Sequence, residues 1–412
     1  MHGSHGPGRF EGVAAASLGT VATSLSVFLI GALAVQISST MSLSLKDLGL
    51  AVSIYYLAAA AAAVPAGRLA ERFGGTRTMR VAAAGAGMCL LLLAVVAKNL
   101  WALAAILAVA GALDAAMQAA ANLFLVRRIA ADRRGLAFGV KQAAVPFTSV
   151  LGGFAVPALG LTVGWRWAFA AAAGLAAIAV WVIPQPRTTL AERRRARGGQ
   201  QADVALAPLV VLAVGFGLSM LSIAALTTFL VTSAVASGLG KGAAGLLVAL
   251  AGGVAVLVRV GVGARADRIV SRHLRLVGGM LFLGATGYVL LAAASATRLV
   301  PLLVLGAVVT YGAGWGWNGL FNMAISISHP AAPAKASGIT LTGNRIAGIA
   351  GPFLFALVVT HISYTVAWLA AALAAVAAAT VIFVGDRTLM ASQARLAAAG
   401  QPPRAGGIHP VK

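Results

Sequence analysis

The sequence predicts an all-α integral membrane protein whose twelve transmembrane helices form two pseudo-symmetric six-helix bundles, with both termini in the cytoplasm. The first observation is composition: 60% of the 412 residues are hydrophobic and only 10% are charged, which is not the composition of a soluble domain. The second is that long apolar stretches alternate with short polar loops along the whole chain. The third is that the cations fall almost entirely in every second loop.

Each predicted span is a stretch of roughly 20 mostly apolar residues, long enough to cross a bilayer as a helix. The first six spans are predicted near residues 17–40, 48–69, 78–97, 100–125, 135–160 and 164–183. The other six are predicted near residues 206–235, 243–264, 276–296, 299–325, 337–360 and 363–385. We therefore expect an N-terminal bundle (1–184), an Arg-rich cytoplasmic linker (185–205), a C-terminal bundle (206–390) and a cytoplasmic tail (391–412).

The distribution of Lys and Arg sets the expected orientation. Of the 31 cations, 23 lie in segments that would share one side of a membrane, whereas the other side holds only Lys46, Lys98, Arg166, Lys241 and Arg298. Cytoplasmic loops carry the excess of Lys and Arg in membrane proteins, so the cation-rich side is the expected cytoplasmic side. We expect a multi-pass protein of the cytoplasmic (inner) cell membrane.

Composition and motifs also exclude several function classes. The net charge of +22 is dispersed over the predicted cytoplasmic loops, which favours contact with membrane lipid headgroups over binding of nucleic acid. A single cysteine, Cys89, can build neither a disulfide framework nor a thiolate metal site. The sequence has no nucleotide-binding loop, metal-ligand cluster or nucleophile–base pattern. We therefore expect neither an enzyme nor a bound cofactor.

The two predicted halves repeat one another. The second span runs into Gly67-Arg68-Leu69-Ala70-Glu71-Arg72, and the eighth runs into the related segment 263–268, so both read G-x-x-x-acidic-Arg. A pair of amides four residues apart also recurs, in the fourth span at 118 and 122 and in the tenth at 318 and 322. Repeated six-helix units are typical of secondary transporters, in which the site lies between the repeats near the membrane midplane.

At these motifs the chain resembles a major facilitator superfamily (MFS) transporter over its whole length. The resemblance is carried by Gly67, Glu71, Arg72, Gly74 and Arg77, by the repeat at Gly263, Asp267 and Arg268, and by the Gly-Trp-Arg-Trp-Ala-Phe run at 164–169. Glu71 stands where Asp is more usual in that family. The resemblance implies the MFS fold, with two halves that rock about a central site in a functional monomer.

The repeated loop motif is expected to form a cytoplasmic gate. Gly67 and Gly263 would let neighbouring helices approach closely. Glu71 and Asp267 would accept hydrogen bonds from helix N-termini or arginines when the cytoplasmic side is closed, and opening would break these bonds. The predicted gate residues are Gly67, Glu71, Arg72, Arg77, Gly263, Asp267 and Arg268.

Charged residues inside the predicted spans are the best indication of function. The cations are Lys141, Arg259 and Arg345, and Asp114 is the one deep acidic residue. A cation at the centre of a span costs about 2.5–3.5 kcal/mol on insertion scales, so it normally faces a partner or an aqueous cavity. The surplus of positive charge predicts an anionic substrate.

Each of these cations also has a structural alternative. Arg345 could form a salt bridge or bind backbone carbonyls, and Lys141 could pair with Asp114 on the adjacent helix. Arg259 could extend to the lipid headgroups or brace Asp267 of the gate.

Polar and aromatic residues at helical spacing complete the expected site. They lie on the fourth and tenth spans, which the resemblance places along the central cavity, and at matching depths of the fifth and eleventh spans. The same stripes could instead be hydrogen-bonding contacts between helices. The predicted substrate-binding residues are Arg345, Arg259, Lys141, Gln142, Asn318, Asn322, Tyr311, Trp315, Gln118, Asn122 and Asn344, and Asp114 is the predicted proton-coupling residue.

Shorter motifs resemble the small organic-anion branches of the superfamily. The Arg259-x-x-x-Gly263-x-x-x-Asp267 spacing and Arg345 resemble monocarboxylate- and oxalate-type carriers, and Lys141-Gln142 resembles the cyanate-type group. Ala63 stands where nitrate porters carry a second arginine, which counts against nitrate. We expect proton-coupled uptake of a small organic anion, or its exchange for a counter-anion, with a carboxylate as the substrate.

Proton-antiport efflux of drugs or metabolites is the alternative. Exporters of this superfamily commonly carry a Gly-Pro-x-x-Gly-Gly element in the fifth span, whereas residues 145–150 read Val-Pro-Phe-Thr-Ser-Val. A pocket with excess positive charge would also disfavour cationic drugs. A membrane sensor that binds without translocating is a third, weaker possibility.

Overall fold

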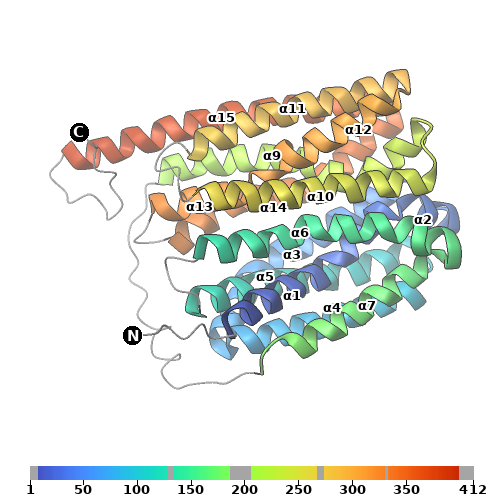
Figure 1. The fold of residues 1–412 in the computed structure, drawn as a ribbon, viewed down its shortest axis with the longest axis horizontal. Coiled ribbons are helices and arrows are strands. Elements are labelled where there is room, and N and C mark those ends of the chain that lie inside the picture. Colours follow the sequence, from blue (N-terminus) through green and yellow to red (C-terminus); the bar gives the residue numbers. More distant parts are fainter. Residues whose placement is uncertain (1–7, 129–133, 186–205, 267–272, 330–332, 399–412) are drawn as a thin grey trace.

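The computed structural model describes residues 8–128, 134–185, 206–266, 273–329 and 333–398, and these are almost entirely helical (Figure 1). Within these ranges, eleven segments are long and apolar enough to cross a membrane. One of them, Ala137–Val182, has 46 residues, or about 69 Å of helix at 1.5 Å per residue, which is twice the thickness of a bilayer. The chain turns at Gly164, where φ is +105°. This segment is therefore two crossings, and the described chain makes twelve, as predicted.

The first six crossings are formed by α1 (Gly8–Ala32) with α2 (Ala34–Met41), α3 (Leu45–Phe73), α4 (Gly75–Val95), α5 (Leu100–Arg128), α6 (Arg134–Ala155) with the π-helix η2 (Val156–Gly164), and α7 (Trp165–Val182). The other six are formed by α9 (Leu206–Ala236), α10 (Lys241–Ala266), α11 (His273–Thr297), α12 (Val300–Val309) with the π-helix η3 (Thr310–Gly314) and α13 (Asn318–Ser328), α14 (Pro333–His361), and α15 (Tyr364–Ala398). Helix α15 continues beyond residue 385, where the last span was predicted to end. The predicted linker lies almost wholly outside the described residues.

Local sequence signals explain where helices begin and end. Helix α3 begins with a capping box, because the Ser44 side chain accepts a hydrogen bond from the Asp47 amide and the Asp47 carboxylate accepts one from the Ser44 amide. Gly74, with φ at +91°, separates α3 from α4 in a conformation that glycine adopts without steric cost. Such short connections keep consecutive helices antiparallel and adjacent.

Helix α1 begins, and α15 ends, at the same end of the bundle (Figure 1). We call this the terminal end and the opposite one the far end. An even number of crossings requires this arrangement. On the predicted orientation, the terminal end is cytoplasmic.

The two halves meet through two symmetry-related helix pairs, α3 with α14 and α6 with α10. At Gly49 of α3, an added Cβ would lie 2.9 Å from the carbonyl oxygen of Pro352 in α14. At Gly153 of α6, it would lie 2.5 Å from the carbonyl oxygen of Gly245 in α10. These contacts leave no room for a side chain, and they lie toward the far end. The halves are therefore tightly closed there.

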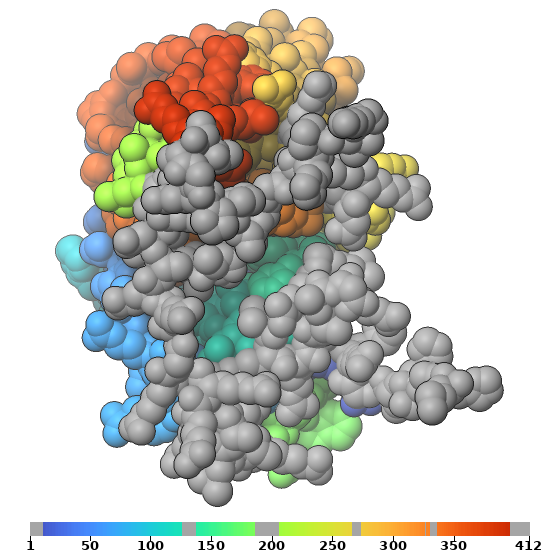
Figure 2. Space-filling view, turned by 90° about the vertical axis from the view of Figure 1, so that its left-hand side faces the viewer, coloured from blue at the N-terminus to red at the C-terminus, as the bar shows by residue number. Residues whose placement is uncertain are grey.

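The same four helices lack such close contacts at four glycines toward the terminal end. An added Cβ would meet no atom within 4 Å at Gly67 of α3, Gly139 of α6, Gly263 of α10 or Gly338 of α14. Figure 2 looks at the terminal end, and there α6, in teal, is recessed between the first half, in blue, and the second half, in orange and red. Among the described residues, the halves are therefore packed more closely at the far end than at the terminal end.

Candidate functional site

Asp114 forms the centre of a polar cluster in the first half. Its carboxylate oxygen Oδ1 accepts hydrogen bonds from the hydroxyls of Thr23, at 2.8 Å, and Ser24, at 3.0 Å. Both hydroxyls come from α1, so the acid on α5 is held against that helix. Tyr55 of α3 and Arg345 of α14 also interact electrostatically with Asp114. Four helices from both halves thus converge on the one deep carboxylate that the sequence singled out.

Lys141 lies next to this cluster and is 1% exposed. Its ammonium donates a hydrogen bond to the side-chain oxygen of Gln118 on α5 and interacts electrostatically with Asp114. The hydrogen-bond partner is therefore the amide of Gln118, whereas Asp114 acts on Lys141 through space. Two predicted site residues from different helices are in direct contact.

Arg259 of α10 is 5% exposed and binds backbone carbonyls. Its Nη1 donates to the carbonyl of Gln142 on α6 at 2.5 Å, and its Nη2 donates to the carbonyl of Trp315 at 3.1 Å. The guanidinium also lies 5.0 Å from the centroid of the Trp315 ring, in cation–π contact. Arg259 therefore points into the interface between the halves instead of extending toward the lipid headgroups.

Arg345 of α14 makes the symmetry-related contact. Its Nη1 donates to the carbonyl of Ala59 on α3 at 2.6 Å. This is the backbone-carbonyl alternative that the sequence left open for Arg345. Arg259 and Arg345 both belong to the second half, and each binds a carbonyl of the first half in one of the two helix pairs that join the halves.

The tenth crossing differs from the single stripe that the sequence predicted. It is not one continuous α-helix, because the π-helix η3 and a turn at Trp317 lie between α12 and α13, and each π turn inserts an extra residue. Trp315 is buried against Phe28 of α1, with ring centroids 5.9 Å apart, and Tyr311 is 0% exposed behind it. Asn318 is buried and Asn322 is partly buried. The four residues therefore lie on successive helical segments instead of one continuous α-helix, although the rings of Tyr311 and Trp315 remain in contact, with centroids 5.4 Å apart.

The polar residues predicted on the fourth span lie on one uninterrupted helix, α5. Asp114, Gln118 and Asn122 recur every four residues on this helix, and all three are partly exposed. Gln142 and Asn344 are also partly exposed, and each is adjacent in sequence to a buried or half-buried cation. The fourth crossing therefore presents the continuous polar face that the sequence predicted.

Comparison with known proteins bears on this arrangement of two six-helix halves around buried charges. The family model described as "Major Facilitator Superfamily" matches residues 16–300. The chain belongs to the major facilitator superfamily. The crystal structure of a D-xylose-proton symporter is similar over 97% of this chain and 99% of that one, with a TM-score of 0.72 and 16% sequence identity. No curated protein sequence matches the chain.

Membership in this family confirms several predictions made from the sequence. The chain is a multi-pass membrane transporter of the MFS fold and is not an enzyme, as the sequence predicted. The similarity in fold to the symporter structure also covers the second half of the chain. At 16% identity this likeness concerns the fold alone, so the substrate has to be argued from the residues of the site.

The described residues of the expected MFS gate lie toward the terminal end. Glu71, Arg72 and Arg77 are exposed. Arg72 and Arg77 lie 5.4 and 5.8 Å from the centroid of the Phe73 ring. Gly67 and Gly263 have open space around them, and Asp267 and Arg268 lie outside the described residues. The role of these residues as a gate remains a prediction.

Several contacts of the site were not predicted. Thr23 and Ser24 are hydroxyl residues in an apolar span, a weak signal that many helices carry. Nothing in the sequence distinguishes Phe28 from the other apolar residues of α1. The carbonyls of Ala59 and Gln142 could not be found from sequence, because every residue has a carbonyl.

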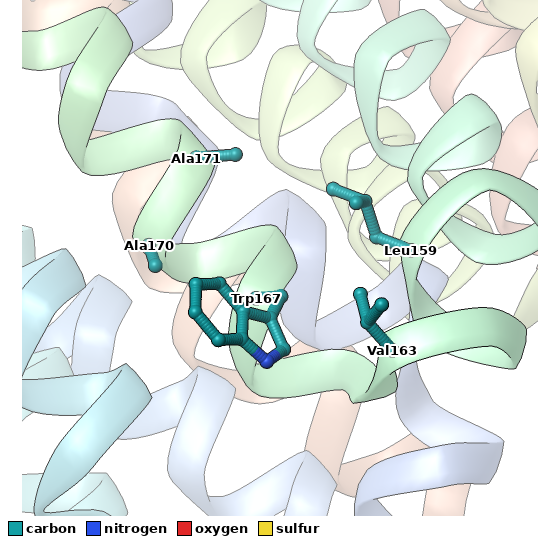
Figure 3. A pocket seen from close by; sticks show the side chains of 5 residues that line it. All are labelled: Leu159, Val163, Trp167, Ala170 and Ala171. Atoms are coloured by element: carbon teal, nitrogen blue, oxygen red, sulfur yellow. The ribbon is translucent and has the colours of Figure 1, made fainter.

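One hollow lies away from these polar residues. It has a volume of about 460 Å³ and is lined almost entirely by apolar surface. Figure 3 shows its lining residues on η2 and α7, which are Leu159, Val163, Trp167, Ala170 and Ala171. Because Trp167 is 61% exposed on the flank of the bundle, this surface faces the expected lipid and not the central site.

Proposed function

We propose that this transporter carries a small organic anion, a carboxylate, across the cytoplasmic membrane. The proposal rests on Arg259 and Arg345, which reach from the second half to the first at the two helix pairs that join them. With Lys141, three cations and one acid, Asp114, lie deep within the described spans. An anion bound between the halves would balance the excess positive charge.

The present partners of the arginines suit replacement by a carboxylate. Arg259 and Arg345 donate to neutral carbonyl oxygens, and the Nε atom of Arg259 has no hydrogen-bond partner among the described residues. Bidentate hydrogen bonds from guanidinium to carboxylate are charge-assisted and roughly twice as strong as neutral ones. A carboxylate that reaches either arginine would therefore displace the carbonyl and form the stronger pair.

Opening of the far end would separate α3 from α14 and α6 from α10. This movement would break the bonds from Arg345 to Ala59 and from Arg259 to Gln142. Leaving such charges unpaired in a low-dielectric interior is costly, and a bound anion removes that cost. Substrate binding is thereby coupled to the change of access between the two sides.

Asp114 is the proposed proton carrier. Thr23 and Ser24 donate to its carboxylate, and the cluster also includes Tyr55 and Arg345. Protonation of Asp114 would remove the one negative charge near Arg345 and leave the arginine free to pair with the substrate. The structurally similar protein is a D-xylose-proton symporter, and we propose proton-coupled uptake here, with exchange for a counter-anion as the other mode of the same site.

The organisation of the cycle belongs to the same proposal. Residues 1–184 and 206–390 would rock as two bodies joined by the linker 185–205, with residues 391–412 as a cytoplasmic tail. The transporter would act as a monomer. Glu71 and Asp267 would close the cytoplasmic side when the far end opens.

Transport in proteoliposomes tests the proposal. Purified protein is supplied with radiolabelled mono- and dicarboxylates, inorganic anions and cationic drugs, with or without an inward proton gradient. We expect carboxylate uptake, which falls at least tenfold in Arg345→Lys and in Arg259→Lys because a lysine cannot form the bidentate pair. Uptake that needs an internal anion, and not a proton gradient, would identify exchange.

The matched control is Arg275→Lys. Arg275 pairs with Asp386 at 3.0 Å inside the second half and is 47% exposed at the side chain, so its replacement should leave uptake unchanged. Normal uptake in both Arg345→Lys and Arg259→Lys would refute the assignment of these residues. Transport of cationic or hydrophobic compounds alone would replace the proposal with proton-antiport efflux.

A further inference from the structure

Phe28 of α1, in the first half, stacks on Trp315 of the second half. The two ring centroids are 5.9 Å apart, the ring planes differ by 16°, and both side chains are buried. Trp315 contacts Arg259 in two ways, because its carbonyl accepts a hydrogen bond from Nη2 at 3.1 Å and its ring centroid lies 5.0 Å from the guanidinium carbon. A continuous series of contacts therefore runs from Phe28 in one half to the buried arginine of the other.

Close packing fixes the backbone that carries Phe28. Helix α1 lies against α6, since an added Cβ on Gly152 would lie 3.2 Å from the Ala32 Cβ. It also meets α9 of the second half, where an added Cβ on Gly31 would lie 2.4 Å from the carbonyl oxygen of Thr227. Phe28 lies one helical turn before these contacts, so its ring projects from a fixed point between the halves.

The Trp315 ring is fixed in a similar way. Its backbone lies against α10, the helix that carries the arginine, because an added Cβ on Gly316 would lie 2.6 Å from Cγ1 of Val258. The Tyr311 ring meets Trp315 edge-on, with centroids 5.4 Å apart and planes at 79°. Phe28 and Tyr311 thus determine the orientation of the indole from two different elements.

The contact with the indole suits an arginine that has to bind an anion. The N–H donors of a guanidinium lie in its own plane, whereas an aromatic ring attracts a cation positioned over the ring face. The ring can therefore hold Arg259 while the in-plane donors exchange carbonyl oxygens for a carboxylate. One of these donors, Nε, is buried and has no hydrogen-bond partner among the described residues.

We propose that Phe28 is a positioning residue for anion binding, which keeps the Trp315 ring against Arg259 and so sets the orientation in which the guanidinium meets the substrate. The inference rests on the proposed transport of a carboxylate. Without the Phe28 ring, the indole and the arginine would be less ordered before binding. Part of the binding free energy would then be used to order them, which weakens the affinity for the substrate.

Uptake kinetics in proteoliposomes test this role. Phe28→Leu keeps an apolar side chain but removes the ring, and Phe28→Met makes the same test if the leucine variant does not fold. The KM for the carboxylate should rise about fivefold, while the maximal rate changes less than about twofold, because an aromatic pair contributes a free energy of this order. Trp315→Leu should also raise KM. The double variant should have the KM of Trp315→Leu alone, because Phe28 acts only through Trp315.

Phe229→Leu is the matched control. The Phe229 ring is buried and stacks on Phe355 within the second half, with centroids 5.4 Å apart and planes 15° apart. The control therefore loses a stacked pair of the same geometry. Its melting temperature should fall by an amount similar to that of Phe28→Leu, with no change in KM.

Several results would overturn the positioning role. These are an unchanged KM in Phe28→Leu, an equal rise in Phe229→Leu, and additive effects of Phe28→Leu and Trp315→Leu. If Arg259→Lys loses carboxylate uptake while Phe28→Leu keeps a normal KM, this role fails and the proposed function stands; a wild-type protein that takes up no carboxylate refutes both. A structure of Phe28→Leu without substrate should show the indole turned away from Arg259, and an unchanged cation–π contact there would overturn the role independently.

Discussion

Replacement of Arg345 by glutamine should loosen the far end of the transporter. The guanidinium Nη1 of Arg345 donates to the carbonyl of Ala59 at 2.6 Å, across the α3–α14 pair. Glutamine is shorter and uncharged, so this bond between the halves is lost while a polar side chain remains. The variant should fold, but it should populate conformations in which the far end is open.

The size of the effect follows from that one bond. A hydrogen bond from a charged group contributes about 1.5–3 kcal/mol, and because Arg345 is partly exposed we take the lower end. At about 1.4 kcal/mol per factor of ten, the ratio of far-end-open to far-end-closed molecules should rise about tenfold. The electrostatic attraction between Arg345 and Asp114 is also lost. This loss destabilises the far-end-closed form, in which Arg345 lies near Asp114, so it too raises the fraction of far-end-open molecules.

Distance measurements between spin labels can detect this shift. Lys98 and Arg298 are exposed at far-end turns of the first and second halves, and the single cysteine, Cys89, is buried and replaceable by serine. Labels at Lys98→Cys and Arg298→Cys should give one distance in the parent protein and an added longer one with Arg345→Gln. The control is Arg275→Gln, which removes a salt bridge within the second half and should not lengthen the distance. An unchanged distribution with Arg345→Gln would refute the reasoning that this bond joins the halves.

The same labels test three further changes. Gly153→Val should hold the far end open and abolish transport, because its Cβ would lie 2.5 Å from the Gly245 carbonyl oxygen; a closed far end with normal transport would contradict the packing. Gly263→Val should be accommodated in the observed conformation, where nothing lies within 4 Å, and should trap it by blocking closure of the terminal end; a longer far-end distance would contradict this. Lys46 and His361 share a hydrogen bond of 2.9 Å across the far end. His361→Leu removes this bond and should lengthen the distance slightly; an unchanged distance would argue against the contact.

The sequence alone determined the fold class and the residues to examine. Spans are recognisable because apolar length is a local property, summed over about 20 neighbouring residues. Lys141, Arg259 and Arg345 could be identified from the local sequence in the same way. A charge within an apolar stretch is costly, and this is apparent before its partner in the fold is known. The repeated G-x-x-x-acidic-Arg motif carried the family, which the family model then confirmed over residues 16–300.

The tertiary structure decided which partner each charge takes. Arg259 and Arg345 bind carbonyls of Gln142 and Ala59, and no sequence pattern distinguishes one carbonyl from another. The π-helix η3 interrupts the tenth crossing, which the sequence pattern had treated as one α-helix. The close packing of the far end could not be predicted either, because it depends on how helices far apart in the chain pack. Hydropathy and spacing report what each segment requires, whereas partners and conformation depend on contacts between segments.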